Sequence, residues 1–223
     1  LATVPIAIWR EPPTASPSAG AALSILPRFF KRPRIWPWLG LIVLYKIGDA
    51  FGSPMVKPLL VDRGLSLSDI GVLVGGLGSA AALCGAMLGG WLAGRAGRPA
   101  ALALSGLIHA ALMAAYALPV LGVGGNTVLS TLMILEHLTG SMATVALFTV
   151  MMDASDESTG ATDYTVQASV IVWATFAGGA PSGLFAQTVG YAPHFLAAGA
   201  ASAIGAVALP LWLARGSTPP RMS

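Results

Sequence analysis

The stretch "DIGVLVGGLGSAAALCGAMLGGWLAG", residues 69–94, is almost entirely apolar and carries no charged residue after the aspartate at its start. A helix needs about 20 mostly apolar residues to cross a bilayer, whereas a barrel strand needs only about half that number. This stretch is too long and too continuous for a barrel strand, so it predicts a helix that spans a membrane.

The rest of the chain has the same character. Of its 223 residues, 55% are hydrophobic and 9% are charged, whereas about a quarter of the residues in soluble domains are charged. Turn-forming residues separate the apolar runs. We therefore predict an all-α membrane protein, a bundle of six transmembrane helices at roughly 37–60, 69–93, 100–122, 127–151, 163–187 and 193–214.

Cationic residues set the expected orientation, because Lys and Arg concentrate in cytoplasmic loops. On one side of a six-span topology lie Arg28, Lys31, Arg32, Arg34, Arg95, Arg98, Arg215 and Arg221. The opposite side carries Arg63 and little else, so we predict that the first side is cytoplasmic. The net charge of +3 comes with no basic patch outside the loops, so we expect no nucleic-acid partner.

Both ends of the chain suggest further organisation. Residues 1–10 look like the end of a preceding transmembrane helix, so we expect a fragment whose N-terminal part is missing; the alternative is an N-terminal tail. Residues 11–36 are expected to form a cytoplasmic central loop, with binding of anionic headgroups as the alternative. Residues 215–223 would be a cytoplasmic tail, leaving 37–214 as the transmembrane domain.

Small residues within the second span predict close helix packing. Gly71 and Gly75, and then Gly85 and Gly89, are four residues apart. Helices in lipid associate through such small residues, because no hydrophobic effect draws them together.

Two ionisable groups interrupt the first span within "LIVLYKIGDAFGSP", residues 41–54. Lys46 and Asp49 are three residues apart, so they share one helix face and can pair, with Tyr45 beside them. Intramembrane charges are costly and often mark substrate or proton pathways. We predict that these residues line such a pathway; a static ion pair between helices is the alternative.

The fourth span contains a second ionisable pair, Glu136 and His137. Adjacent residues on a helix point about 100° apart. We therefore predict that one side chain faces a cavity while the other packs or reaches toward the interface, and we favour Glu136 as the cavity group. His109, alone in the third span, is expected to be a packing histidine.

Asp163, Tyr164 and Gln167 open the fifth span and complete the predicted pathway residues. Asp163 could instead cap that helix, and Tyr164 and Gln167 could form ordinary hydrogen bonds between helices. No catalytic or metal-binding motif is evident: the fourth span lacks the second histidine of a metalloprotease helix. We expect no enzyme activity, no metal and no cofactor.

Three segments resemble a known family. "YKIGDAFGSP" (45–54) with the span after it, "EHLTGSMATVALFTVMMD" (136–153) and "GATDYTVQASV" (160–170) are similar to spans seven, eight, ten and eleven of the AmpG-related permeases. These permeases are a branch of the major facilitator superfamily. The resemblance covers residues 37–214 and implies the C-terminal half of a twelve-helix fold in the bacterial inner membrane, with a missing N-terminal six-helix half as partner.

The resemblance also implies a function. In this family spans seven and ten line the transport cavity, which would place Lys46, Asp49 and Glu136 beside the substrate. The sequence around residues 162–165 is more similar to the siderophore-uptake subgroup typified by the RhtX and FptX permeases. We therefore expect proton-coupled uptake of a siderophore. The alternatives are a muropeptide permease of the AmpG type and a non-transporting structural six-helix protein. The expected partners are a small-molecule substrate, protons and the lipid bilayer.

Overall fold

The computed structural model describes residues 26–215, in which every regular element is helical. Six of its helical stretches are long and apolar enough to cross a membrane: Ile35–Asp62, Leu67–Arg95, Arg98–Val120, Gly125–Asp153, Gly160–Val189 and Tyr191–Ala214. The predicted six-helix fold is therefore confirmed, with span ends that differ by a few residues. The expectations for residues 1–10, 11–25 and 216–223 lie outside the described residues.

Three of the spans consist of more than one helical element. The first contains α3 (Ile35–Gly52), the 3₁₀ turn η1 (Ser53–Met55) and α4 (Val56–Asp62). The second contains α5 (Leu67–Ile70), the π-helical segment η2 (Gly71–Gly78) and α6 (Ser79–Arg95). The third contains α7 (Arg98–Ala115) and α8 (Ala117–Val120). The last three spans are α9 (Gly125–Asp153), α10 (Gly160–Val189) and α11 (Tyr191–Ala214).

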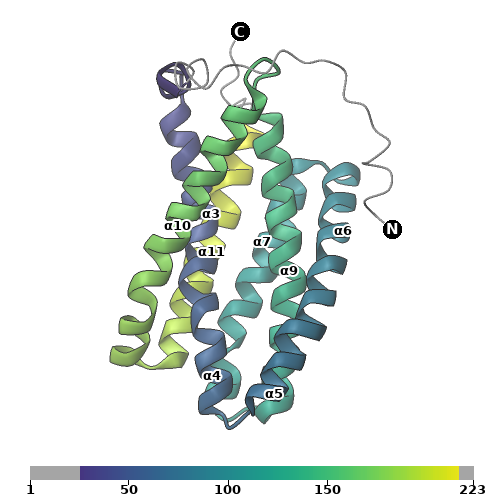
Figure 1. Cartoon of the computed structure of the whole chain (residues 1–223), viewed down its shortest axis with the longest axis vertical. Helices are drawn as coiled ribbons and strands as arrows, with labels where there is room; N and C mark the ends of the chain where they lie inside the picture. Colours follow the sequence, from purple (N-terminus) through teal and green to yellow (C-terminus); the bar gives the residue numbers. More distant parts are fainter. Residues whose placement is uncertain (1–25, 216–223) are drawn as a thin grey trace.

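The helices run up and down and form a folded row (Figure 1). By their contacts the order is α10, α3, α11, α7, α9 and α6, so α10 and α6 lie at the two ends of the row. Figure 1 shows α3, α10 and α11 on one side and α6, α7 and α9 on the other. The first and fourth spans therefore belong to different groups of three, and a site between them can draw on both groups.

Proline explains the break in the first span. Pro54 is the residue after Ser53 in η1, and it has no N–H with which to continue the hydrogen bonds of α3. The backbone tightens into a 3₁₀ turn at this point, near the middle of the span. Such turns within a long helix often mark a hinge or a functional position.

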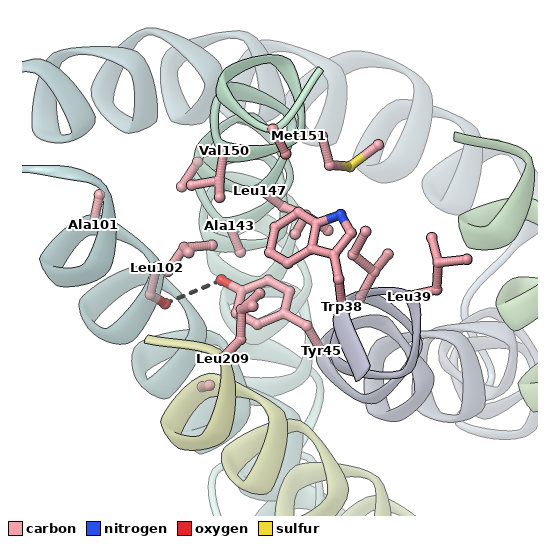
Figure 2. Packing of buried hydrophobic residues seen from close by; sticks show 14 of the residues in the cluster. Trp38, Leu39, Tyr45, Ala101, Leu102, Ala143, Leu147, Val150, Met151 and Leu209 are labelled. Carbon is pink, nitrogen blue, oxygen red and sulfur yellow. Dashed lines mark hydrogen bonds between the residues drawn. The ribbon is translucent and has the colours of Figure 1, made fainter. Parts of the chain in front are cut away.

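The buried core lies between the two groups of helices. Figure 2 shows Trp38 and Tyr45 of α3 packed together with Leu102 of α7 and Leu147 of α9. The Tyr45 hydroxyl donates a hydrogen bond of 3.0 Å to the Leu102 carbonyl oxygen. This bond satisfies the phenol within an apolar environment and joins α3 to α7.

The glycine prediction is half confirmed. Gly85 and Gly89 are buried, and a Cβ at either position would meet the backbone of α9 at Leu138 or Met142. Gly71 and Gly75 are exposed, and a Cβ at either position would have no neighbour within 4 Å, so that part was wrong. Both lie in η2, where hydrogen bonds of the i→i+5 type rotate the chain relative to an α-helix and turn these glycines away from α9.

Candidate functional site

A cluster of polar side chains lies where the middles of the first, third and fourth spans meet. Nζ of Lys46 lies 2.5 Å from Oδ2 of Asp49, and Nε2 of His109 lies 3.3 Å from Oδ1 of the same carboxylate. The Ser53 hydroxyl lies 2.9 Å from Oδ1 of Asp49 and 2.9 Å from Oε1 of Glu136. We call these five residues the central cluster.

Helical spacing brings three of the five together. Lys46 and Asp49 are one turn apart on α3, and Ser53 follows Asp49 by four residues, so all three share a face. The predicted pairing of Lys46 with Asp49 is present. Both side chains are largely buried, with 13% and 24% of their surface exposed. Such burial requires partners, because an unpaired charge at this depth is costly.

The fourth span contributes both of its ionisable residues to the same region. Glu136 is 7% exposed, and Nδ1 of His137 lies 3.1 Å from its Oε2. Nδ1 of His137 is also 3.0 Å from the Met133 carbonyl oxygen. The expectation that one of the two would turn away was wrong, because the imidazole folds back over its neighbour; Gly78 of η2 leaves room for the ring.

The central cluster borders a groove of about 650 Å³, which lies within the usual size range of ligand pockets. Residues from the first, second, fourth and fifth spans line it. Among its polar lining groups are Lys46, Asp49, Ser53, Lys57, Glu136, His137, Ser141, Thr144 and Thr175. The charged residues therefore border a space large enough for a small solute.

A much smaller cavity lies on the other side of Asp49. Its volume is about 10 Å³, and its lining includes Tyr45, Lys46, Asp49, His109 and Ser202. This is roughly the space that one water molecule occupies. Tyr45 lines this small cavity and not the groove, and its hydroxyl is bonded to the backbone of α7.

The other predicted pathway residues lie elsewhere. Asp163 is fully buried near the start of α10, where its carboxylate accepts two hydrogen bonds from Arg32, at 2.6 and 3.0 Å. Gln167, one turn further on, accepts a bond of 2.8 Å from Nε1 of Trp38. Tyr164 packs edge-on against Phe148. These residues tie helix ends together and do not line the groove.

Three residues of the site were missed or misjudged from the sequence. His109 is buried, as expected of a packing histidine, but it also contacts Asp49 from another helix, and Gly140 leaves space for its ring. Ser53 could have been found, because it lies one turn after Asp49 on the same face. Lys57 is exposed and lines the groove, and it has no ion pair among residues 26–215.

The cluster has the composition of a metal site. Single ligand atoms of Asp49, His109 and Glu136 lie within 4.8 Å of one another. However, Lys46 and His109 already contact the two oxygens of Asp49, and Ser53 contacts Glu136. Lys46 would therefore compete with a metal ion for Oδ2 of Asp49.

Comparison with known proteins supports a membrane permease. No family model matches the chain. The anhydromuropeptide permeases of Escherichia coli K12 and of Escherichia coli O157:H7 are each 30% identical to it over 190 residues. The match covers 85% of this chain and 39% of each relative, so the chain spans about two fifths of their length. The chain is a distant homologue of these permeases. Together with its six apolar helices, this makes it a multi-pass inner-membrane protein.

Proposed function

We propose that the chain forms part of a secondary transporter that moves a muropeptide-like solute across the inner membrane, driven by protons. The observation that carries this proposal is the central cluster, in which four ionisable side chains meet near the middle of three spans, beside a groove of about 650 Å³. Ionisable groups in such a position commonly serve a substrate or an ion. The names of the two permease relatives support the substrate class.

The arrangement suits alternating access. In secondary transporters a site near the midplane is exposed first to one side and then to the other as two bundles rock. The helices around the groove belong to a row that ends at α10 and α6. A second helix bundle packed against this row could therefore close the groove. We propose that the remaining part of the transporter supplies that second wall. We also propose that the basic end, where Arg32, Arg95 and Arg98 lie, faces the cytoplasm.

Lys57 is the proposed anchor for the solute. A peptide-bearing solute has at least one carboxylate, and an unpaired ammonium group in the groove would attract it. Lys46 is a weaker candidate, because Asp49 already neutralises it at 2.5 Å. Lys57 would therefore contribute to binding, while the pair of Lys46 and Asp49 would remain available to respond to protons.

The proton-coupling step is proposed to involve Asp49 and Glu136. These two carboxyl groups share contact with Ser53. Among residues 26–215, the permanently charged cation in contact with this pair is Lys46, which binds Asp49. Binding of a proton would neutralise the excess negative charge, and its release would restore it. A change of this kind alters the free energy of closing the groove, which is the requirement for coupling.

The siderophore expectation receives no support from the two relatives, which are named for muropeptides. It stays a prediction, as does the absence of enzyme activity. Uptake by vesicles that contain the full-length protein tests these alternatives together. We expect labelled anhydromuropeptide to accumulate only when the proton gradient is present. Accumulation of a ferric siderophore instead would favour the first expectation, and transport of neither solute by well-folded protein would favour a structural role.

A further inference from the structure

The Ser53 hydroxyl lies between two carboxyl groups. Its Oγ is 2.9 Å from Oδ1 of Asp49 and 2.9 Å from Oε1 of Glu136. A serine hydroxyl has one hydrogen to donate, and an ionised carboxylate can only accept. If both carboxyl groups were ionised, one of these two contacts would join two oxygen atoms with no hydrogen between them. A single proton on either carboxyl group gives both contacts a donor.

The charges around the two carboxyl groups also favour one bound proton. On the first span the charged groups are Lys46, Asp49 and the more distant Lys57; α9 adds Glu136 and His137, and α7 adds His109. The parts of η2, α6, α10 and α11 that line the two cavities add no charged side chain. At the centre, one ammonium group therefore faces two carboxyl groups. One bound proton balances the charge, and buried charges are strongly driven toward such balance.

We propose that Asp49 and Glu136 share a single proton through Ser53, and that the serine relays this proton between them. In one state Glu136 donates its O–H to the Ser53 oxygen, while the Ser53 O–H donates to Asp49. In the other state Asp49 donates to Ser53, and Ser53 donates to Glu136. Passing from the first state to the second breaks the Glu136 O–H bond, exchanges the hydrogen on Ser53 and forms the Asp49 O–H bond, so one proton moves and the total charge is unchanged.

A histidine contacts each of the two carboxyl groups that Ser53 bridges. His137 contacts the outer oxygen of Glu136 at 3.1 Å and also lines the groove. His109 is 4% exposed and contacts Asp49 at 3.3 Å, beside the cavity of about 10 Å³. His137 therefore lies at the end of the proposed relay that faces the groove, and His109 lies at its buried end. Among residues 26–215, Ser53 is the residue that hydrogen-bonds to both carboxyl groups.

The backbone makes this bridge sensitive to conformation. Ser53 is the first residue of η1, directly before Pro54, where the first span departs from α-helical geometry. A small change at this turn would move Oγ relative to α9 and separate Asp49 from Glu136. Opening of the groove and transfer of the proton would then depend on the same turn.

This inference rests on the proposed function, and its test separates the two. The full-length protein and its Ser53→Ala and Ser53→Thr variants are reconstituted in vesicles, with Ser169→Ala as a matched control, since Ser169 is exposed and bonds only to its own helix. Solute counterflow, which needs no net proton movement, is compared with accumulation driven by a proton gradient. We expect Ser53→Ala to keep counterflow and to lose accumulation at least about tenfold, and Ser53→Thr to restore it. Accumulation at the parent rate in Ser53→Ala would overturn the relay.

A second measurement needs no transport. Infrared spectroscopy of the purified protein at neutral pH detects the C=O stretch of a protonated carboxyl group. A shared proton predicts that Asp49→Asn and Glu136→Gln each abolish this band and that Ser53→Ala shifts it. If the band survives either amide substitution unchanged, the shared proton is refuted. If the parent shows the expected bands but transports no muropeptide, the proposed substrate fails and the proton bridge stands.

Discussion

Arg32 and Asp163 are joined by two hydrogen bonds that link the segment before the first span to the start of the fifth. Both side chains are almost fully buried. Thr159 accepts a further bond from the guanidinium group, and the backbone N–H of Asp156 donates to the carboxylate. A residue predicted to lie on a transport pathway thus belongs to a closed ion pair at the basic end of the bundle.

This ion pair predicts a large loss of stability when one partner is removed. Arg32→Ala would leave the Asp163 carboxylate buried without its main partner, which costs about 3–5 kcal/mol. Thermal unfolding of the purified protein in detergent measures the change. Arg98→Ala is the matched control, because its ion pair with Asp153 is about half exposed and should contribute no more than about 1 kcal/mol. Equal effects of the two substitutions would contradict the assignment.

The contact between α6 and α9 makes a second prediction. In Gly85→Ala the new Cβ would meet the Leu138 backbone, which cannot move aside as a flexible side chain can. We expect the free energy of unfolding to fall by about 1–3 kcal/mol. Gly75→Ala introduces the same methyl group where no atom lies within 4 Å. It should leave stability unchanged or raise it slightly, because alanine favours helix.

Tyr45 offers a test of a residue that the sequence placed on the pathway. Tyr45→Phe removes the bond to the Leu102 carbonyl oxygen but keeps the packing of the ring. Stability should fall by about 1 kcal/mol, while the rate of solute uptake stays at the parent level. A strong loss of uptake without a loss of stability would show that the hydroxyl has a role in transport.

Lys57 should act on binding rather than on turnover. Lys57→Gln removes the unpaired ammonium group from the groove, so we expect KM for an anionic solute to rise about tenfold, with little change in kcat. Arg63→Gln is the control, since Arg63 lies outside the lining of the groove. The proposal for Lys57 would be wrong if both variants keep the parent KM.

Part of this architecture could be predicted from the sequence, for physical reasons that apply to any chain in lipid. Span length and hydropathy predict the six helices, and the three-residue spacing of Lys46 and Asp49 predicts their pairing. The position of Asp163 was harder to judge, because hydropathy does not say whether a polar residue in the first turn of a span meets the groove or another helix end. Arg32, its partner, is 131 residues away along the chain.

The contact of His109 with Asp49 could not be predicted from the sequence, for a similar reason. A lone histidine in an apolar helix gives no signal of its partner until the order of helices in the bundle is known. His137 could not be placed for a different reason. Neighbouring side chains leave a helix in directions about 100° apart, but a flexible side chain can fold back onto its neighbour. Side-chain direction on a helix is thus a weaker guide than spacing.

The central claim is that Asp49 and Glu136 couple protons to solute movement. The most direct test measures gradient-driven accumulation and counterflow in vesicles containing the full-length protein, its Asp49→Asn and Glu136→Gln variants, and the Glu157→Gln control, which alters an exposed loop residue. We predict that Asp49→Asn and Glu136→Gln both keep counterflow but lose accumulation, whereas Glu157→Gln behaves like the parent. Accumulation at the parent rate in both Asp49→Asn and Glu136→Gln would contradict it.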